Sequence, residues 1–435
     1  MNATELYALY LKQGQATTDS RDCPAGSIFF ALKGESFNGN KFAAAALEKG
    51  CAYAVVDEAE YAVEGDARYI LVPDVLQAFK DMAREHRRRF DIPVIGITGT
   101  NGKTTTKELI AAVLERRYDV LYTQGNFNND VGVPKTLLRL EKQHQIAVIE
   151  MGASHPGDIK TLVETVEPTC GLITNVGKAH LQGFGSFEGV MRTKGELYDY
   201  LHAHHCEVFA NRDNPYLEQM RERAGIDKAT YYGQSDDATI ATRGELIDCT
   251  PFLHFRWQWG DGPWHEVETH LIGAYNLDNM LAAIAIGVRF GVSPEQISEA
   301  LANYIPSNNR SQLDVTAHNK LIVDAYNANP TSMAAAIQNF SLIRDEHKMA
   351  ILGDMRELGE ASAEEHQKMV ELIAGKEVGR VWLVGEEFGK TRCDFRKFKD
   401  VEEVKSEIAK LQPRGYYILI KGSNGIHLAE LKELL

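Results

Sequence analysis

The fold of this chain is decided by one stretch of its sequence, Gly96-Ile97-Thr98-Gly99-Thr100-Asn101-Gly102-Lys103-Thr104-Thr105-Thr106. An apolar segment precedes the stretch and a helical pattern follows it, which is the context in which a phosphate-binding loop forms. Glycines allow backbone N–H groups to turn inward around phosphate oxygens, and the helix N-terminus adds a favourable dipole. We therefore expect Lys103 to reach the terminal phosphates of a nucleotide and the Thr104 hydroxyl to coordinate Mg²⁺.

The loop departs from the common GxxxxGK[ST] pattern at one position, because Ile97 stands where the first glycine belongs. Its glycines are instead Gly96, Gly99 and Gly102. The alternative is a glycine-rich turn between strand and helix that carries a surface lysine. The flanking strand and helix patterns favour the phosphate loop.

Two further strand ends supply candidate metal ligands. The apolar segment Ile146–Glu150 ends in an acid that could hold Mg²⁺ beside the loop. His180 follows another apolar segment. Taken alone, an acid at a strand end can be purely structural, and a lone histidine is more often a surface or core residue than a ligand.

Strand and helix patterns alternate along the whole chain, which predicts an α/β protein with a mostly parallel central sheet covered by helices on both faces. At roughly 150 residues per domain, the 435 residues suggest about three domains. We expect them at 1–91, 92–305 and 306–435, since Ile92-Pro93 and the polar stretch Tyr304–Arg310 interrupt the pattern.

The strand candidates share an apolar, β-favouring composition. They are Ser27–Ala31, Ala52–Val56, Arg68–Val72, Val94–Thr98, Ala147–Glu150, Gly171–Thr174, Glu207–Ala210, Leu321–Asp324, Met349–Leu352, Val381–Val384 and Tyr417–Ile420. The segment Pro251–Leu271 is also β-like and predicts added antiparallel strands. The run Arg87-Arg88-Arg89 ends the helix candidate Val75–Arg89, and we interpret it as a solvated helix end.

The composition excludes several classes of protein. A net charge of −14 argues against nucleic acid as a partner, because nucleic-acid binders usually present a basic face. The six cysteines are far apart and form no CxxC pair, which favours reduced thiols over a disulfide framework or a zinc site. No apolar run reaches the ~18 residues of a membrane span. We expect a cytoplasmic protein that neither binds nucleic acid nor inserts into a membrane.

Several motifs together identify a family. They are Gly96–Thr106, Thr123–Pro134, Ala179–Ser186, Lys194–Glu196, Asp324–Pro330, Gly353–Gly359 and Lys421–Ser423. In this order they resemble the Mur ligases, whose folylpolyglutamate synthetase relatives share the variant phosphate loop. Within the family, the motifs resemble the member that adds D-alanyl-D-alanine.

The resemblance implies a fold and a reaction. The expected domains are a small α/β domain that binds a UDP-sugar peptide, a central ATP-binding domain, and a Rossmann-like C-terminal domain that binds the acceptor. ATP would phosphorylate the terminal carboxylate of UDP-N-acetylmuramoyl-tripeptide, and the amine of D-Ala-D-Ala would attack the acyl phosphate. The product would be the pentapeptide precursor of peptidoglycan, made by an enzyme that we expect to be a monomer.

The resemblance also assigns residues. The expected nucleotide contacts are Gly99, Thr100, Asn101, Gly102, Lys103, Thr104, Thr105, Asn276, Asn279, Arg310 and Asp324. Of two Mg²⁺ ions, Thr104 and Glu150 would hold one, and His180 and Lys194 would lie near the other. Because a cation does not suit a metal ligand, the family's solution is a carbamate on Lys194. The expected catalytic residues are Lys103, Lys194, His180 and Arg310, although Asn309 precedes Arg310 where the family often has glycine.

The expected contacts to the two other substrates come from all three domains. They are Ser20, Arg21, Lys33, Gly34, Asn128, Asn129, Asp130, Asn327, Asn329 and Lys421. Lys421, at the end of the last strand candidate, would anchor the carboxylate of the dipeptide.

Three alternatives stand beside this interpretation. A Mur ligase that adds a diamino acid typically carries an Asp-Asn-Pro-Xaa-Arg string in its last domain, and this sequence has none. Folylpolyglutamate synthetase fits poorly at Thr123–Pro134 and Asp324–Pro330. A non-catalytic nucleotide-binding module would need Lys103, Glu150 and His180 to be vestigial.

Overall fold

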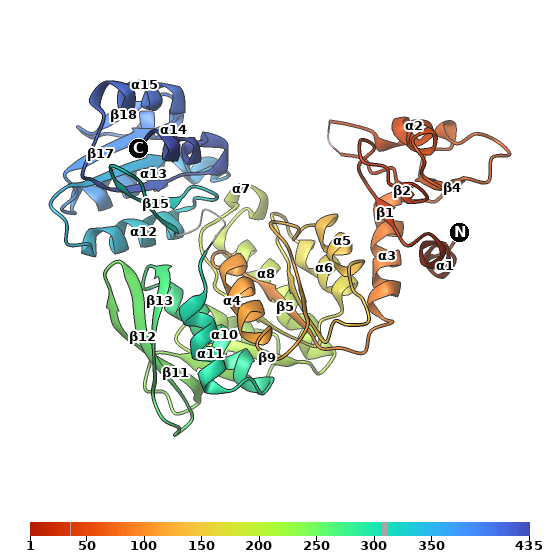
Figure 1. Cartoon of the computed structure of the whole chain (residues 1–435), viewed down its shortest axis with the longest axis horizontal. Helices are drawn as coiled ribbons and strands as arrows, with labels where there is room; N and C mark the ends of the chain where they lie inside the picture. Colours follow the sequence, from red (N-terminus) through yellow and green to blue (C-terminus); the bar gives the residue numbers. More distant parts are fainter. Residues whose placement is uncertain (35, 307–311) are drawn as a thin grey trace.

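The short apolar segments pair into three separate sheets, and each sheet forms the centre of one α/β domain (Figure 1). The computed structural model describes residues 1–34, 36–306 and 312–435. The three-domain α/β architecture expected from the sequence is therefore confirmed. No helix in these described ranges combines the length and the apolar character needed to cross a bilayer.

The N-terminal domain is built on a four-stranded sheet whose strands are parallel and follow the order β1-β2-β3-β4. Its strands are β1 (Ala16–Thr17), β2 (Ile28–Phe30), β3 (Tyr53–Val56) and β4 (Tyr69–Leu71). Its helices are α1 (Ala3–Gln13), η1 (Gly39–Phe42), α2 (Ala43–Glu48), η2 (Ala59–Tyr61) and α3 (Val75–Arg87). The sequence reasoning missed α1, although Asn2 and Glu5 form a capping box at its start.

The central domain holds a nine-stranded sheet in the order β13-β12-β11-β10-β9-β8-β5-β7-β6. Its strands are β5 (Val94–Thr98), β6 (Val120–Tyr122), β7 (Ile146–Glu150), β8 (Cys170–Ile173), β9 (Glu207–Asn211), β10 (Thr230–Gly233), β11 (Ile240–Cys249), β12 (Phe252–Trp259) and β13 (His265–Ile272). The strands from β6 to β11 are parallel, and β12 and β13 are antiparallel as the β-like segment predicted.

Helices cover both faces of the central sheet, because its strands are apolar on both sides. The central helices are α4 (Lys103–Leu114), α5 (Gly132–Leu137), α6 (Asp158–Val166), α7 (Leu181–Phe184), α8 (Phe187–Ala203), α9 (Pro215–Arg223), α10 (Asn276–Arg289) and α11 (Pro294–Asn303). One core packs α4, α10 and α11 on the sheet, and a second core packs α5, α6, α8 and α9 on the opposite face.

The C-terminal domain contains a six-stranded sheet in the order β14-β15-β19-β16-β17-β18, in which only β14 is antiparallel among the described residues. Its strands are β14 (Gln312–Val315), β15 (Lys320–Asp324), β16 (Lys348–Gly353), β17 (Arg380–Val384), β18 (Arg396–Phe398) and β19 (Tyr417–Lys421). Its helices are α12 (Pro330–Leu342), η3 (Gly359–Ala361), α13 (Ser362–Ala374), α14 (Glu386–Gly389), α15 (Val401–Leu411), η4 (Asn424–Ile426) and η5 (Leu428–Leu434).

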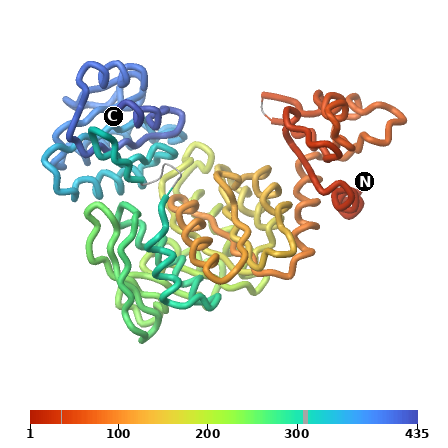
Figure 2. Tube along the Cα trace, in the orientation of Figure 1, coloured from red at the N-terminus to blue at the C-terminus, as the bar shows by residue number. Residues whose placement is uncertain are grey.

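The domains are not equally close to one another. The N-terminal domain projects from the central domain on α3, on the far side from the C-terminal domain, as the trace in Figure 2 shows. The C-terminal domain lies beside the central domain at the end of the sheet where the phosphate loop is found. The first domain is therefore held mainly through one helix.

The arginine run at the end of α3 is solvated at Arg88 and Arg89, which are exposed, but our interpretation is wrong for Arg87. The Arg87 side chain is buried and donates to the carbonyl oxygens of Val166, Phe90 and Glu167 at 3.0–3.1 Å. Arg88 pairs with the Glu167 carboxylate at 2.7 Å. A run of charge does not reveal burial, because two of the three partner carbonyls, those of Val166 and Glu167, are about 80 residues away in sequence.

We predict that Arg87→Ala destabilises the junction between α3 and the central domain. Loss of the guanidinium leaves buried carbonyls without donors, which costs about 1–3 kcal/mol. Thermal unfolding followed by circular dichroism should show a lower midpoint for this variant. Arg89→Ala, at an exposed position two residues away, is the matched control and should leave the midpoint unchanged. Equal midpoints for all three proteins would contradict this role of Arg87.

Candidate active site

The phosphate loop lies where the parallel strands β8, β5 and β7 end side by side. Gly99 has φ +145° and Gly102 has φ +77°, both in the region that favours glycine. A Cβ on Gly102 would lie 2.6 Å from Asn279 Oδ1. Lys103, the first residue of α4, points its ammonium back along the loop and donates to the carbonyl oxygens of Gly99 and Thr100 at 2.7 and 3.1 Å. The loop therefore has the positively charged, inward-turned form that binds phosphate.

The Glu150 carboxylate, at the end of β7, faces this loop. Its Oε1 atom accepts hydrogen bonds from Thr104 Oγ1 at 3.2 Å and from Asn128 Nδ2 at 2.8 Å. Its Oε2 atom is buried and has no hydrogen-bond partner among the described residues. A buried, unpaired carboxylate oxygen is costly, and a hard cation is the ligand that satisfies it.

These residues fit one Mg²⁺ ion that is shared with a nucleotide. In the described part of the chain, no group of three or more His, Cys, Asp or Glu side chains could hold a metal ion by itself. The site offers one carboxylate oxygen and the Thr104 hydroxyl. Phosphate oxygens would have to complete the shell, as they do in nucleotide-binding sites with Mg²⁺.

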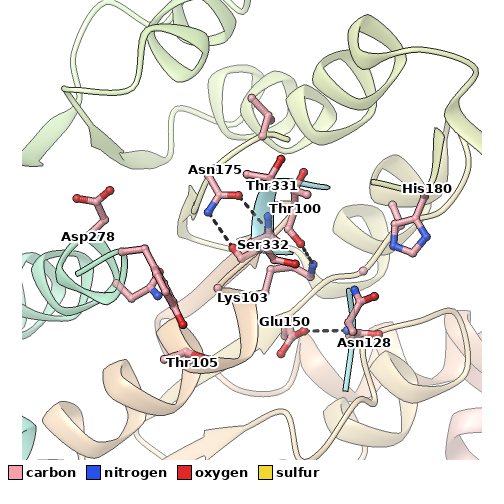
Figure 3. Close-up of a pocket in the computed structure, with 18 of the residues that line it drawn as sticks. Thr100, Lys103, Thr105, Asn128, Glu150, Asn175, His180, Asp278, Thr331 and Ser332 are labelled. Carbon is pink, nitrogen blue, oxygen red and sulfur yellow. Dashed lines mark hydrogen bonds between the residues drawn. The ribbon is translucent and has the colours of Figure 1, made fainter. Parts of the chain in front are cut away.

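His180 lies to one side of the nucleotide loop, opposite Asp278, as Figure 3 shows. Its backbone is left-handed, with φ +50°. Its Nδ1 atom forms an ion pair with Glu357, which belongs to the C-terminal domain. The hydrogen bond from His180 holds the pKa of the Glu357 carboxyl below its usual value. His180 is therefore the point where a side chain of the C-terminal domain reaches the central site.

Lys194 is an almost fully buried lysine, with 2% of its surface exposed, in the middle of α8. Its ammonium is 3.4 Å from the Ala153 carbonyl oxygen and 5.4 Å from the centre of the Phe184 ring. Burial holds the pKa of this amine well below its usual value, and the charge of Lys103 lowers it further. Lys194 does not line the main cavity, so the side chain lies just behind the residues that do.

The opposite end of the site is formed by α10 and the strand ends beside it. Asn279 accepts from Thr106 Oγ1 at 3.0 Å and donates to Asn276 Oδ1 at 2.8 Å. Asp278 accepts from Gln234 Nε2 at 2.8 Å, and burial raises the pKa of its carboxyl. These amide and carboxylate groups offer the donors and acceptors that a nucleotide base needs.

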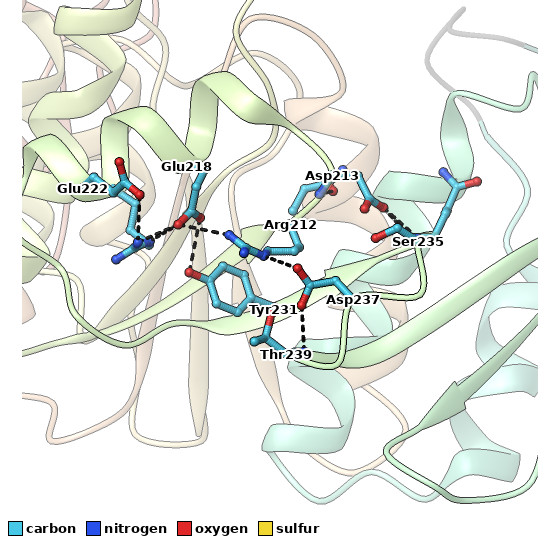
Figure 4. A network of polar contacts seen from close by, with 11 residues as sticks. Arg212, Asp213, Glu218, Glu222, Tyr231, Ser235, Asp237 and Thr239 are labelled. Atoms are coloured by element: carbon cyan, nitrogen blue, oxygen red, sulfur yellow. Dashed lines mark hydrogen bonds and ion pairs between the residues drawn. The ribbon is translucent and has the colours of Figure 1, made fainter.

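A polar network holds the loops behind this end in place (Figure 4). Arg212 lies between Asp237 and Glu218, at 2.9 and 3.1 Å. Asp213, next in sequence, accepts from the backbone N–H groups of Gln234 and Ser235. The network ties the loop after β9 to the loop after β10, and both loops line the cavity.

The C-terminal domain contributes an ion pair. Asp324 ends β15 and Lys421 ends β19, and the two residues are direct partners in the parallel register. Lys421 Nζ lies 2.5 Å from Asp324 Oδ2, and the lysine is 1% exposed. Asp324, which we expected to contact the nucleotide, therefore pairs with Lys421, which we expected to contact the acceptor.

One cavity of about 940 Å³, close to the upper end of the usual range for ligand sites, connects these groups. The expected site residues that line it are Thr100, Asn101, Gly102, Lys103, Thr105, Asn128, Asn129, Asp130, Glu150, His180, Asn276, Asn279, Asp324, Asn327 and Lys421. Gly99 and Thr104 lie directly behind the lining. Asn329 also lies behind it and donates to Asn101 Oδ1 at 2.7 Å, which joins the C-terminal domain to the phosphate loop.

Some expected site residues lie elsewhere. Ser20, Arg21, Lys33 and Gly34 belong to the N-terminal domain, none of whose described residues lines this cavity. Arg21 pairs with Asp19, and Lys33 pairs with Asp57 and Glu58. Arg310 lies outside the described residues. The roles of all five residues stay predictions.

The sequence reasoning missed several lining residues. They include Asn175, Asp213, Gln234, Tyr275, Asp278, Tyr326, Thr331 and Ser332. Asn175 could have been found by the same rule that selected Glu150, because it follows β8 and exchanges hydrogen bonds of 3.0 Å with the backbone of Asn101. Asp278 and Gln234 gave no such signal, since they meet only in the folded chain.

Family models and known proteins match this chain along most of its length. Residues 15–87 match "Mur ligase family, catalytic domain", residues 97–287 match "Mur ligase middle domain", and residues 309–424 match "Mur ligase, glutamate ligase domain". The UDP-N-acetylmuramoyl-tripeptide–D-alanyl-D-alanine ligase of Bacillus subtilis is 34% identical over 434 residues, which cover 96% of this chain and 92% of that protein. The Escherichia coli protein of the same name is 34% identical over 384 residues, which cover 88% and 84% of the two chains.

Two solved structures share the fold over nearly the full length. MurF from Acinetobacter baumannii has a TM-score of 0.88 at 30% identity and covers 97% of this chain and 93% of that one. The MurF ligase from Thermotoga maritima in complex with ADP has a TM-score of 0.86 at 26% identity, covering 97% and 96% of the two chains.

We predict that Gly99→Ala reduces nucleotide affinity without unfolding the chain. The new Cβ would collide with Thr174 Oγ1 in a backbone conformation that L-residues rarely adopt. Strain of about 1–3 kcal/mol corresponds to about 5- to 160-fold in the dissociation constant. Isothermal titration with ADP is the measurement.

The control is Gly389→Ala in α14, where an added Cβ meets no atom within 4 Å. Its affinity for ADP should equal that of the unaltered protein. An unchanged affinity in Gly99→Ala would mean that this loop does not hold the phosphates.

Proposed function

This chain belongs to the Mur ligase family, and we propose that it joins D-alanyl-D-alanine to UDP-N-acetylmuramoyl-tripeptide with the hydrolysis of ATP to ADP and phosphate. The observation that carries the proposal is the full-length relation to ligases of that name, 34% identical over 96% of this chain. The cavity supports it, because it combines a phosphate loop, an acidic metal site and a buried cation.

The reaction must turn a poor electrophile into a good one. A carboxylate resists attack by an amine, and transfer of the γ-phosphoryl group converts it into an acyl phosphate with phosphate as the leaving group. The protein's task is to hold two anions in line and to offset their repulsion. Lys103 neutralises charge on the nucleotide, and the loop N–H groups orient its phosphates.

Within this site, Thr104 and Glu150 are the residues that would hold one Mg²⁺ ion at the nucleotide. Bound there, Mg²⁺ would supply the charge neutralisation that phosphoryl transfer requires. Asn276 and Asn279 present amide groups to the base, and their hydrogen bonds to each other and to Thr106 keep both side chains in place. The expected role of Arg310 belongs to the same proposal.

Lys194 suits the carbamate that the family resemblance implied. The burial that lowers the pKa of its amine keeps a fraction neutral, and only a neutral amine attacks carbon dioxide. The nitrogen forms a bond to carbon and loses a proton, which converts the side chain into an anion. Such an anion, together with His180, is what the proposal requires to hold a second Mg²⁺ ion.

The acceptor needs an anchor at the right distance. In an extended chain, the carboxylate of a dipeptide lies ~3.5 Å further from the amine than that of an amino acid. Lys421 is buried at the end of β19 and faces the same cavity as the phosphate loop. We propose that it binds the acceptor carboxylate, and that Asn327 and Asn329 border the same position.

The UDP-sugar peptide would extend from the N-terminal domain to the cavity. Ser20, Arg21, Lys33 and Gly34 are the proposed contacts in that domain, and Asn129 and Asp130 are the proposed contacts beside the phosphate loop. The six cysteines are free thiols, in keeping with the cytoplasm as the proposed compartment.

We predict that the acceptor is a dipeptide. With ATP and UDP-N-acetylmuramoyl-tripeptide present, kcat/KM measured by ADP release should be higher for D-Ala-D-Ala than for D-alanine, L-lysine or diaminopimelate by at least about a hundredfold. The carboxylate of a shorter acceptor would not reach the ammonium of Lys421, and the loss of this charge-assisted contact is what favours the dipeptide. If a free amino acid equals the dipeptide, the proposed substrate is wrong.

We predict that Lys194→Ala retains less than about a tenth of kcat, because the second anionic position is lost. Short carboxylic acids added to the buffer should restore part of the activity by occupying the space of the side chain. Arg192→Ala, at an exposed position on the same helix, is the control and should remain fully active. Full activity of Lys194→Ala would eliminate the carbamate.

A further inference from the structure

Asn128 and Thr123 attach the loop between β6 and α5 to the end of β7. The Asn128 carbonyl oxygen accepts from the Gly152 N–H at 2.7 Å, and the Asn128 side-chain amide donates to Glu150 Oε1 at 2.8 Å. Thr123, at the start of the loop, accepts from the Glu150 N–H at 3.0 Å. The loop therefore holds Glu150 by both its backbone and its carboxylate.

The two carboxylate oxygens of Glu150 are in different situations. Oε1 accepts two hydrogen bonds, from Asn128 and from Thr104, whereas Oε2 is buried without a partner in the described ranges. An amide N–H group donates and cannot bind a cation, so the contact reserves Oε1 for hydrogen bonds. Oε2 is left as the oxygen available to a metal ion.

The Asn128 side chain is closely packed. A Cβ on Gly152 would lie 2.9 Å from Asn128 Oδ1, so the amide packs directly on the glycine. If the amide turned away from Glu150, it would lose both its hydrogen bond to that carboxylate and its packing on Gly152. Asn129, by contrast, accepts from the N–H groups of Val131 and Gly132 and caps the start of α5.

We propose that Asn128 is a positioning residue for the metal-binding carboxylate: it fixes the rotamer of Glu150 so that Oε2 faces the Mg²⁺ ion of the bound nucleotide. This inference rests on the proposed function, because it takes Glu150 as a ligand of that ion. It differs from the substrate contact that the motif resemblance assigned to Asn128. Hydrogen-bond partners of this kind typically contribute about 10–100-fold to metal affinity.

This role of Asn128 would link the sugar-peptide substrate to the metal site. Asn129 and Asp130 line the cavity in the same loop, directly after Asn128. A substrate that moves this loop would also move the carboxylate that holds the metal ion. Occupancy of the peptide position and affinity for the metal ion are therefore linked through one side chain.

The test measures metal binding without turnover. Mn²⁺ replaces Mg²⁺ as the probe, and its binding is followed by electron paramagnetic resonance with a non-hydrolysable ATP analogue and no UDP-peptide or acceptor. Asn128→Ala should weaken Mn²⁺ affinity by about tenfold or more. Gln124→Ala, at an exposed position in the same loop, is the matched control and should change it by less than about twofold. Asn128→Leu, which keeps the volume but removes the donor, should behave like Asn128→Ala and replaces it if that variant does not fold.

One outcome would contradict this role of Asn128. If both Asn128 variants bind Mn²⁺ as the unaltered protein does, Asn128 does not position the carboxylate, and a raised KM for the UDP-peptide would then make it a substrate contact. Because no acceptor is present, the result does not depend on which amine the enzyme uses. Failure of the dipeptide assignment would leave this test valid.

Discussion

The register of three parallel strands sets the geometry on which the rest of the active site depends. Ile97 of β5 pairs with Glu150 of β7, and Thr98 pairs with Ile173 of β8, so the three strands end within one residue of each other. Backbone hydrogen bonds fix this alignment far more firmly than any side chain could. The phosphate loop, Glu150 and the loop that leads to His180 must then emerge at the same edge of the sheet.

The C-terminal domain joins this rigid edge through contacts that are individually weak. Asn329 bonds to Asn101 at 2.7 Å, Lys178 pairs with Glu365 at 2.8 Å, and Glu357 pairs with His180. Partly exposed ion pairs contribute about 0–1 kcal/mol each. An interface of this kind can open to admit a dipeptide and close to keep water from an acyl phosphate. The Asp324–Lys421 pair adds a link between the nucleotide and acceptor sides.

Much of this could be predicted from the sequence, since local patterns govern it. β5 was predicted to the residue, and Lys103, Glu150 and His180 all follow strand ends, where parallel sheets place ligands. The features that could not be predicted from the sequence depend on contacts between residues that are far apart in the chain. The burial of Arg87 needs carbonyl groups from α6, and the role of Asn128 needs the end of β7. Sequence periodicity and motif spacing cannot reveal these contacts, because the contacts form only through tertiary packing.

The fate of one oxygen atom tests the reaction most directly. The terminal carboxylate of the tripeptide substrate is labelled with ¹⁸O at both oxygens, and the released phosphate is examined by mass spectrometry. If that carboxylate attacks the γ-phosphorus of ATP, one labelled oxygen leaves with the phosphate when the amine displaces it, and the other stays in the amide. We expect one ¹⁸O atom in each phosphate released with product. Phosphate without the label would contradict the acyl-phosphate reaction assigned to this active site.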